Sequence, residues 1–264
     1  MYLISIITIT FNDLDGLKKT IDSIDKNYNS LITNINHIII DGNSTDGTKM
    51  FLGNNLTERS INTIIISEPD SGIYDAMNKG VLNSSSDFVL FINSGDIVLP
   101  FFFSTEINQY LKSIYADSKC AGLALGCLYN FNGIRIKIKP RVVNKYSPKM
   151  PSLHQAIIYK KSILLEIPYS LKFKICGDFD NIARIINKYN FQIFNINIAE
   201  LNAGGISTIK PLLLLNESFL IYKKNFSPNI YNKIKYFFKL SFSLLFVQIL
   251  FLLSRIFISL KNYF

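Results

Sequence analysis

The chain has 264 residues, 48% of them hydrophobic, and carries a formal net charge of +9. This size suits one domain with a tail better than two equal domains, because one substantial core can be buried. Its three cysteines, Cys120, Cys127 and Cys176, lack paired spacing, which argues against a disulfide framework or a zinc site. We expect them to be small buried side chains in a reducing cytosol.

The charge is distributed unevenly along the chain. Residues 1–100 hold 6 Lys/Arg against 12 Asp/Glu, residues 101–206 hold 14 against 6, and residues 207–264 hold 8 against 1. Basic surface suits nucleic acid, but no nucleic-acid-binding motif is present. The basic residues at the C-terminal end are interleaved with apolar ones, which suits an anionic membrane surface better.

The first part of the chain alternates strand and helix patterns. The N-terminal segment MYLISIITITF has neither a basic lead-in nor a cleavage site, so we expect a strand at 4–10 rather than a signal peptide, and a body that stays in the cytoplasm. Apolar residues at helical spacing predict a helix at 14–24. The apolar runs 37–41, 63–67 and 87–93 predict three more buried strands. This alternation predicts a Rossmann-like α/β fold, a mostly parallel sheet with helices on both faces.

The rhythm changes after Pro100. Segments 121–129 and 133–139 read as a pair of strands, and the second alternates isoleucine with arginine or lysine, which predicts one wet face. A strand at 154–159, a helix at 178–189 and a late strand at 191–198 follow.

The last part of the chain, residues 207–264, is expected to be a separate helical tail behind a domain at 1–206. Residues 240–254 form an uncharged run, LSFSLLFVQILFLLS, with lysines before and after it. As a helix the run spans about 22 Å, short of the roughly 30 Å hydrocarbon layer. We expect an amphipathic, in-plane or shallow membrane helix with a basic collar; a buried core helix and a true span remain the alternatives.

Polar side chains stand at or after the ends of the first four predicted strands. The carboxyl ends of parallel strands meet at one edge, where open α/β sheets bind ligands. A single such aspartate is usually a helix cap, but four strand ends together favour a functional site. Carboxylates and phosphate oxygens are the ligands that Mg²⁺ and Mn²⁺ prefer, and ionised aspartates accept hydrogen bonds from a base or ribose. The residues concerned are Thr10, Asn12, Asp41, Asp70, Asn93 and Asp96.

Two phosphate-binding motifs are missing. Neither GxxxxGK[ST] nor GxGxxG occurs, which argues against a nucleoside triphosphatase or a dinucleotide enzyme.

Over residues 3–206 the chain resembles family 2 glycosyltransferases, the inverting GT-A enzymes. The resemblance is carried by ISIITITFN, IIIDGNSTDGT, EPDSGIYDAMNKG, FINSGD, MPSLHQAIIYKKSI and CGDFDNIARI. It implies a GT-A fold, a nucleotide-sugar donor and a divalent cation, Mn²⁺ or Mg²⁺.

The resemblance also implies roles for individual residues. Asp178, which opens the predicted helix, corresponds to the catalytic base, with Asp180 as the competing candidate and helix capping as the structural alternative. Asp96 is the implied metal ligand. His154 is either a further metal ligand, an acceptor-site residue or a packed core histidine. Nucleotide-sugar contacts are implied for Thr10, Asn12, Asp41, Asp70, Lys79 and Asn93.

The chain departs from the family pattern at two places. Asn93 and Gly95 stand where relatives often carry acids, which leaves Asp96 as the one carboxylate of the metal motif. Met77 stands where many members carry an arginine, and Lys79 is the nearby cation.

The implied function is inverting transfer of a hexose from a UDP-sugar, UDP-glucose or UDP-galactose, to a lipid-diphosphate-linked sugar in O-antigen or capsule assembly. The basic, apolar tail predicts the cytoplasmic face of the inner membrane as its location. The alternatives are transfer to a polyprenyl phosphate or a protein, or a non-catalytic sugar-nucleotide-binding membrane protein.

Overall fold

The computed structural model describes residues 3–29, 34–54, 56, 59–131, 133–146, 149–202 and 210–226, and separate positions between 229 and 242. Most of the apolar run 240–254 therefore lies outside the described residues. In the described part of the chain, no helix is both long and apolar enough to cross a membrane.

The first part of the chain folds as alternating strands and helices, as predicted. The first two strands are runs rich in isoleucine that become buried on both faces, whereas the third, Asn62–Ser67, was predicted to be buried but is only partly so because it forms the edge of the sheet. Asp13 begins the first helix, because its carboxylate accepts the Gly16 N–H at 3.1 Å. The elements are β1 (Leu3–Thr10), α1 (Leu14–Asn27), β2 (Asn34–Asp41), α2 (Thr48–Asn54), β3 (Asn62–Ser67), α3 (Ile73–Leu82) and β4 (Phe88–Phe91).

The second part holds the predicted strands and several elements that the pattern did not predict. The segment predicted as a strand from residue 154 begins with a 3-10 turn and becomes a strand at Ile157, and the predicted helix 178–189 ends at Ile185. The short β5 and the helices α4 and α5 were not predicted, whereas α8 lies in the segment expected to be a helical tail. The elements are β5 (Ile97–Val98), η1 (Pro100–Phe103), α4 (Thr105–Tyr115), β6 (Cys120–Phe131), β7 (Ile134–Ile138), η2 (His154–Ala156), β8 (Ile157–Lys160), α5 (Lys161–Glu166), α6 (Gly177–Ile185), β9 (Asn190–Asn202) and α8 (Pro211–Phe226).

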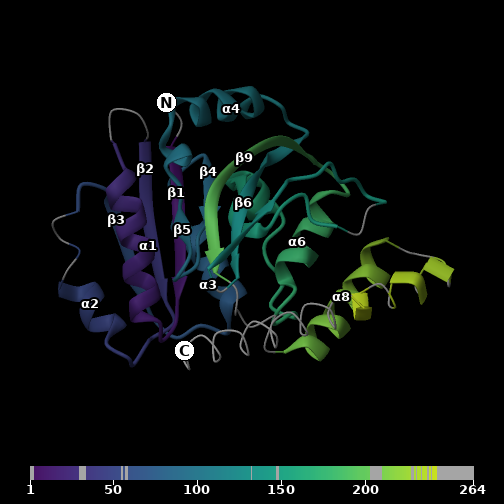
Figure 1. Ribbon diagram of the computed structural model, residues 1–264, viewed down its shortest axis with the longest axis horizontal. Helices are drawn as coiled ribbons and strands as arrows, with labels where there is room; N and C mark the ends of the chain where they lie inside the picture. Colours follow the sequence, from purple (N-terminus) through teal and green to yellow (C-terminus); the bar gives the residue numbers. More distant parts are fainter. Residues whose placement is uncertain are drawn as a thin grey trace, which may run out of the picture.

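One twisted sheet runs through the molecule (Figure 1). Its order is β3-β2-β1-β4-β8-β6-β9-β5, with β7 paired to β6. The first four strands in this order are parallel to one another, and so are β6 and β9. Antiparallel pairs join β8 to both β4 and β6, β7 to β6 and β5 to β9. The prediction of a mostly parallel α/β sheet is confirmed for the half that follows the alternating pattern.

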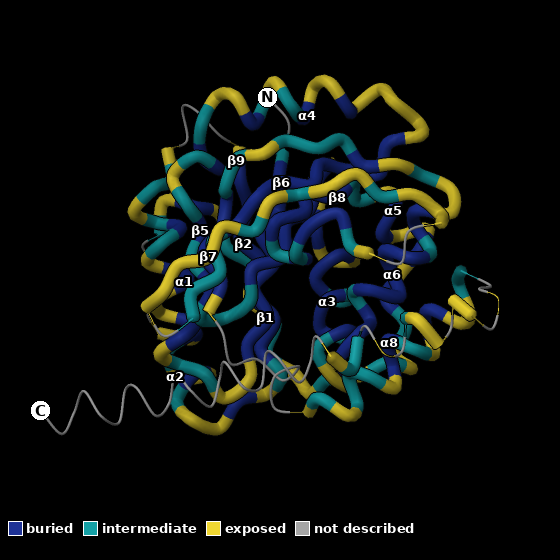
Figure 2. The backbone as a smooth tube through the Cα atoms, turned by 45° about the vertical axis from the view of Figure 1, so that its right-hand side comes forward, coloured by how far each residue is buried: buried dark blue, intermediate teal, exposed yellow. Residues whose placement is uncertain are grey.

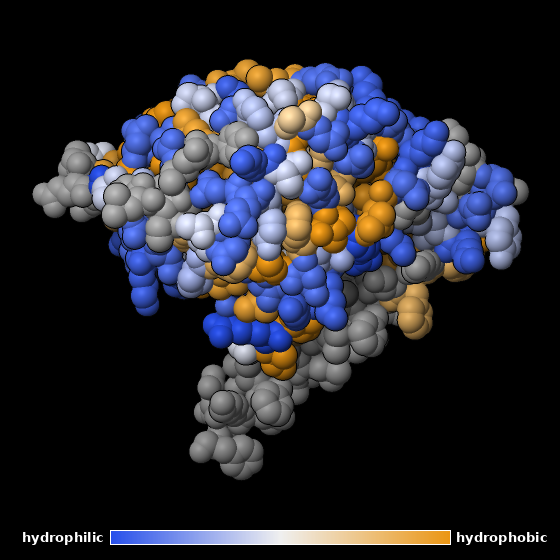
Figure 3. Space-filling view, turned by 90° about the horizontal axis from the view of Figure 1, so that it is seen from above, coloured by the Kyte–Doolittle hydropathy of each residue, from blue (hydrophilic) through white to orange (hydrophobic). Residues whose placement is uncertain are grey.

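Helices cover both faces of the sheet, as predicted. Ile4 and Ile6 pack in one core cluster with residues of α1 and α4, whereas Ile7 and Ile9 pack in a second with residues of α3, α5 and α6. This alternation follows from the two-residue period of a strand. The three cysteines are free and buried, as expected. Seen from above, hydrophobic side chains are interspersed among hydrophilic ones (Figure 3).

The helix α8 packs beside α6 (Figure 1). Ile221 is fully buried in a small core cluster with Phe179 and Ala183 of α6. The first described helix after residue 206 is thus in contact with the helix that begins near Asp178.

Candidate active site

The register of the parallel strands brings predicted strand-end residues together at one edge of the sheet. Thr10 at the end of β1 lies opposite Asp41 at the end of β2, and Asp41 lies opposite Ser67 at the end of β3. The loops that follow these strands form the walls of two adjoining cavities.

Asp41 and Asn12 hold the loops of this edge in place. Asp41 is fully buried, and its carboxylate accepts hydrogen bonds from the N–H and hydroxyl of Ser44 and from the Ser67 hydroxyl at 2.7 Å. The Asn12 N–H donates to Ser44 Oγ at 2.7 Å, and its side-chain oxygen accepts the Thr45 N–H at 2.8 Å. These bonds hold the Asp41 carboxylate and the Asn12 side-chain oxygen within the protein, and direct contact of either residue with a nucleotide stays a prediction.

The first cavity has a volume of about 550 Å³ and lies against the ends of β1 and β4. Thr10, Asp70 and Asn93 line it. The hydroxyl of Thr10 is buried and has no partner among the described residues, so it is available to a ligand. Asp70 accepts the Gly72 N–H at 2.9 Å and lies close to Gly42, where an added Cβ would come within 2.7 Å of the carboxylate. We call this space the nucleotide-side cavity.

Lys79 fixes the turn in front of α3. Its ammonium forms an ion pair with Glu68 at 2.8 Å, donates to the Pro69 carbonyl at 2.8 Å and lies 3.7 Å from Asp75. The hydrogen bond to Glu68 is the largest cause that raises the pKa of Lys79. Its predicted contact with the donor's phosphates stays a prediction.

The second cavity, of about 650 Å³, shares Gly72, Ile73 and Asn93 with the first. We call it the base-side cavity, because Asp178 lines it. Gly72 has a φ of 119° immediately before α3, a conformation that favours glycine. Met77 contributes an apolar wall.

Asp178 and Asp180 lie on different sides of α6, as their spacing requires. Asp178 is half-buried and lines the base-side cavity, and burial raises the pKa of its carboxyl to about 6. Asp180 is fully buried and pairs with Arg184 at 2.8 Å. Of the two candidate bases, Asp178 is therefore the one exposed to the cavity.

Two residues from distant parts of the chain hold the loop in front of Asp178. The Tyr74 hydroxyl donates to the Ile175 carbonyl at 2.5 Å and lies 3.5 Å from the Asp178 carboxylate. From α8, the carboxylate of Glu217 accepts the N–H groups of Lys174, Ile175 and Cys176 at 2.8, 2.9 and 3.0 Å. The sequence patterns did not point to Tyr74 or Glu217. Glu217 does carry one visible signal, since it is the sole acidic residue among residues 207–264.

Asp96 is linked to the base-side cavity through Gln155. Gln155 lines the cavity and donates to one Asp96 oxygen at 3.2 Å, while the Asn202 N–H donates to the other at 3.2 Å. Burial raises the pKa of the Asp96 carboxyl to about 7. Among the described residues, no cluster of three His, Cys, Asp or Glu side chains is placed to hold a metal ion.

His154 lies in an aromatic cluster behind the same cavity. Its ring stacks on Phe91 at 4.9 Å, and its Nδ1 lies 3.5 Å from the Tyr169 hydroxyl. Burial lowers the pKa of its imidazole to about 3, so the ring is neutral. Its Nε2 has no partner within the described part of the chain. The neighbouring Asn93 Oδ1 of the shared cavity wall is also buried without a partner there.

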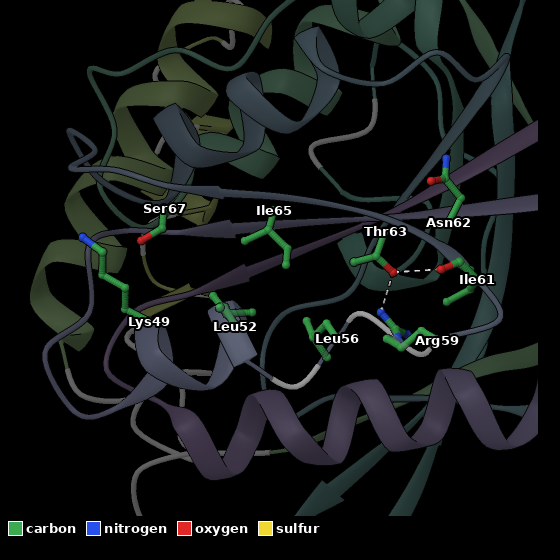
Figure 4. A pocket seen from close by; sticks show the side chains of 10 residues that line it. Lys49, Leu52, Leu56, Arg59, Ile61, Asn62, Thr63, Ile65 and Ser67 are labelled. Carbon is green, nitrogen blue, oxygen red and sulfur yellow. Dashed lines mark hydrogen bonds between the residues drawn. The ribbon is translucent and has the colours of Figure 1, made fainter.

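A further cavity, of about 690 Å³, lies at the outer edge of the sheet between α2 and β3 (Figure 4). Arg59 lies at its wall and donates to Thr63 at 2.9 Å. The same guanidinium pairs with Asp25 at 2.6 Å and contacts the buried His37 at 2.9 Å. These contacts give Arg59 and His37 structural partners within the fold. The cavity includes none of the predicted site residues.

Solved structures of other proteins show the fold class to which the chain belongs. S. aureus TarS in complex with UDP aligns with a TM-score of 0.58 and 14% identity over 87% of this chain and 68% of TarS. A mannosyltransferase of Pyrobaculum calidifontis, in complex with GDP-Man and Mn²⁺, aligns with a TM-score of 0.64 and 12% identity over 86% of this chain and 64% of that one. The fold is that of GT-A glycosyltransferases.

Similar sequences identify the family of the chain. Residues 5–114 match the family Glycosyl transferase family 2. An uncharacterised glycosyltransferase of Mycobacterium tuberculosis is 32% identical over 183 residues, which are 69% of this chain and 68% of the relative. A PGL/p-HBAD biosynthesis glycosyltransferase of Mycobacterium bovis is 27% identical over 182 residues, 67% of each chain. The chain belongs to glycosyl transferase family 2.

Proposed function

We propose that this glycosyltransferase moves a hexose, with inversion, from a UDP-sugar to a hydroxyl group of a lipid-diphosphate-linked sugar. The favoured donors are UDP-glucose and UDP-galactose, and the favoured setting is the assembly of O-antigen or capsule repeat units. One observation carries the proposal: Asp178 lines the cavity that adjoins the nucleotide-side cavity, and its carboxyl has a pKa of about 6. A base with such a pKa is ionised at neutral pH and still accepts a proton readily.

The chemical step is a direct displacement. Asp178 takes the proton from the acceptor hydroxyl, and the hydroxyl oxygen attacks the anomeric carbon on the face opposite the diphosphate. The bond between the anomeric carbon and the phosphate oxygen breaks, and the nucleoside diphosphate leaves with the electron pair. The configuration at the anomeric carbon is inverted.

The donor atoms around the shared cavity wall fit Mn²⁺ or Mg²⁺ in kind. Asp96, which contacts the wall through Gln155, would hold the ion. The unpartnered Asn93 Oδ1 is a further oxygen donor, and His154 Nε2 is a nitrogen donor that suits Mn²⁺ better than Mg²⁺. Diphosphate oxygens and water are the usual remaining ligands of such ions. A bound ion supplies positive charge that offsets the negative charge of the leaving diphosphate.

The lipid-linked acceptor and the location at the cytoplasmic face of the inner membrane are supported by charge and hydropathy. Residues 207–264 carry eight basic residues against one acidic one, together with the uncharged run 240–254. An acceptor anchored in lipid presents its sugar at the membrane surface, where such a segment binds. We propose that residues 207–264 associate with the membrane peripherally.

A donor panel tests the function. The full chain is incubated with Mn²⁺, a diphosphate-lipid GlcNAc or GalNAc acceptor, and UDP-glucose, UDP-galactose, UDP-GlcNAc or GDP-Man in turn. We expect transfer from a UDP-hexose and a product of inverted anomeric configuration by NMR. A product of retained configuration would contradict the displacement by Asp178, and UDP binding without transfer from any donor would favour a sugar-nucleotide-binding protein.

A further inference from the structure

A strip of exposed residues runs along β7 and the loop that follows it. We call residues 134–146 the basic strip. Figure 2 shows β7 largely in the colour of exposed residues. Its exposed apolar side chains are Ile134 at 66%, Ile136 at 48%, Val142 at 82% and Tyr146 at 79%. Its exposed cations are Arg135, Lys137, Lys139, Arg141 and Lys145.

The basic strip lies in a long part of the sequence without acidic residues. No Asp or Glu occurs between Asp117 and Glu166. Within the described part of the chain, one cation of the strip forms an ion pair, Arg135 with Glu200 at 3.0 Å. The remaining four cations give the strip a positive charge that faces solvent.

Protection of the sheet edge explains only part of this pattern. Among the described strands, β7 pairs with β6 alone, so its outer edge is open. Lysine and arginine on an edge strand discourage pairing with another chain. They do not explain why isoleucines of the same strand face water, nor why Val142 and Tyr146 beyond it are more exposed still.

Two other partners fit less well than a lipid surface. Antiparallel pairing of β7 with a second copy would set lysine and arginine of one strand against those of the other, which is unfavourable. A soluble polyanion would use the cations but would leave the apolar side chains in water. An anionic membrane satisfies both, since its headgroups attract cations and its interior accepts apolar and aromatic side chains.

We propose that the basic strip docks on an anionic membrane surface, with its cations at the lipid headgroups and Val142 and Tyr146 inserted among the lipids. This adds a second contact, within residues 1–206, to the membrane association proposed for the tail. The docking itself does not depend on the transfer reaction.

Residues next to the basic strip in sequence share a cavity with Asp178. Lys149 and Met150, just beyond the strip in sequence, line a cavity of about 400 Å³ together with Asp178. Docking would therefore bring the surroundings of the base close to the lipid surface. This step rests on the proposed function, because it assumes an acceptor anchored in lipid.

A single tryptophan tests insertion, because the chain has none of its own. The full chain carrying Tyr146→Trp is mixed with vesicles of phosphatidylcholine and phosphatidylglycerol, and we expect its emission to move to shorter wavelength. The control is Met50→Trp, at a residue of α2 that is 70% exposed, whose emission should not change. Unchanged emission of Tyr146→Trp on vesicles that bind the protein would overturn the proposal.

Charge removal tests the headgroup contact. Lys137→Gln together with Lys139→Gln should weaken binding to the same vesicles on the order of 30-fold. The matched pair Lys19→Gln and Lys112→Gln, on exposed positions of α1 and α4, should weaken binding far less. Equal losses for both pairs would overturn the proposal, and so would binding to soluble polyphosphate as tight as to vesicles.

The vesicle assays contain neither donor nor acceptor, so their outcome is independent of the proposed function. Transfer to a water-soluble acceptor analogue should be the same for the Lys137→Gln, Lys139→Gln variant and the unaltered chain. A loss of that transfer would place these lysines in the acceptor site and overturn the assignment to a membrane.

Discussion

The two sides of the candidate site are held together by different kinds of contact. On the nucleotide side, Asp41 bonds Ser44 three residues away and Ser67 of the neighbouring strand. On the base side, Ile175 in the loop before Asp178 is held at both backbone groups. Its carbonyl accepts from Tyr74, 101 residues earlier in the chain, and its N–H donates to Glu217, 42 residues later. The first side is built from neighbouring loops of one parallel sheet, and the second joins three distant parts of the chain.

This difference suggests how each side responds to substitution. On the nucleotide side, Asp41 is bonded within the protein, while Thr10 Oγ1 and Asn93 Oδ1 have no partner among the described residues, so changes there should act on stability or on donor binding. The base side depends on the position and charge of one carboxylate, so changes there should act on turnover.

The largest expected effect is that of Asp178→Asn. An amide cannot take the acceptor's proton, so kcat should fall about 10²- to 10⁴-fold, while UDP binding measured by calorimetry is retained. Asp180→Asn is the matched control, because it removes a buried carboxylate paired with Arg184 in the same helix. It should lower thermal stability but leave turnover per folded molecule nearly unchanged. The reverse result would make Asp180 the base.

The next effect separates two aspartates of the nucleotide side. Asp70 lines the nucleotide-side cavity, so Asp70→Asn should raise the donor KM about 10-fold or more without a comparable loss of stability. Asp41 is buried among hydroxyl and N–H donors, so Asp41→Asn should cost about 1–3 kcal/mol of unfolding free energy. Kinetics and urea unfolding of both variants measure the contrast. A larger effect of Asp41→Asn on donor KM than on stability would place Asp41 in direct contact with the nucleotide.

A smaller effect is expected from Glu217→Gln. The amide retains one acceptor oxygen, so at least one of the backbone N–H groups before Asp178 loses its partner. We expect kcat to fall about tenfold, as for one lost hydrogen bond to a charged group, with the donor KM unchanged. Glu166→Gln is the control, since Glu166 is an exposed partner of Lys188 and Tyr189. Equal effects of the two substitutions would make Glu217 an ordinary stabilising residue.

The sequence predicted the nucleotide half of the fold well for a physical reason. Parallel strands buried on both faces must be continuous apolar runs, and β1, β2 and β4 are such runs, whereas β3 at the sheet edge is apolar but only partly buried. Their ends necessarily meet at one edge, which is why Thr10, Asp70 and Asn93 were predicted together and line one cavity. Lys79 was predicted through the family resemblance, as the cation near Met77, but its charge is used within the turn before α3.

The base half was harder to predict because its contacts are long-range. Periodicity reports which face of an element is buried, and it does not report which distant element covers that face. The helix α8 falls in residues 207–264, which were assigned to a membrane tail because of their basic charge and the uncharged run 240–254. The close packing of Tyr74 on Gly177, where an added Cβ would lie 2.6 Å from the ring, is likewise invisible in either segment alone.

The smallest effect expected is a change in pH dependence. Burial raises the pKa of Asp178 to about 6, and the negative charge of Glu217 also raises this pKa. Since the base must be ionised, kcat/KM should fall as the pH drops below about 6. Folding stability should depend on pH in the opposite sense. Because the pKa of Asp178 is higher in the folded protein, the protonated carboxyl contributes stability that is fully present below the unfolded pKa of about 3.9. This contribution is lost as the pH rises through about 6.

Glu217→Gln separates the effect of charge from that of position. Removing the negative charge should lower the pKa of Asp178, so the acid limb of the kcat/KM profile should move to lower pH. Loss of loop position alone would reduce kcat equally at every pH. A pH profile of Glu217→Gln beside Glu166→Gln measures this directly. An acid limb that stays in place with a reduced plateau would assign Glu217 a role in position only, because the charge would then have no measurable effect on the base.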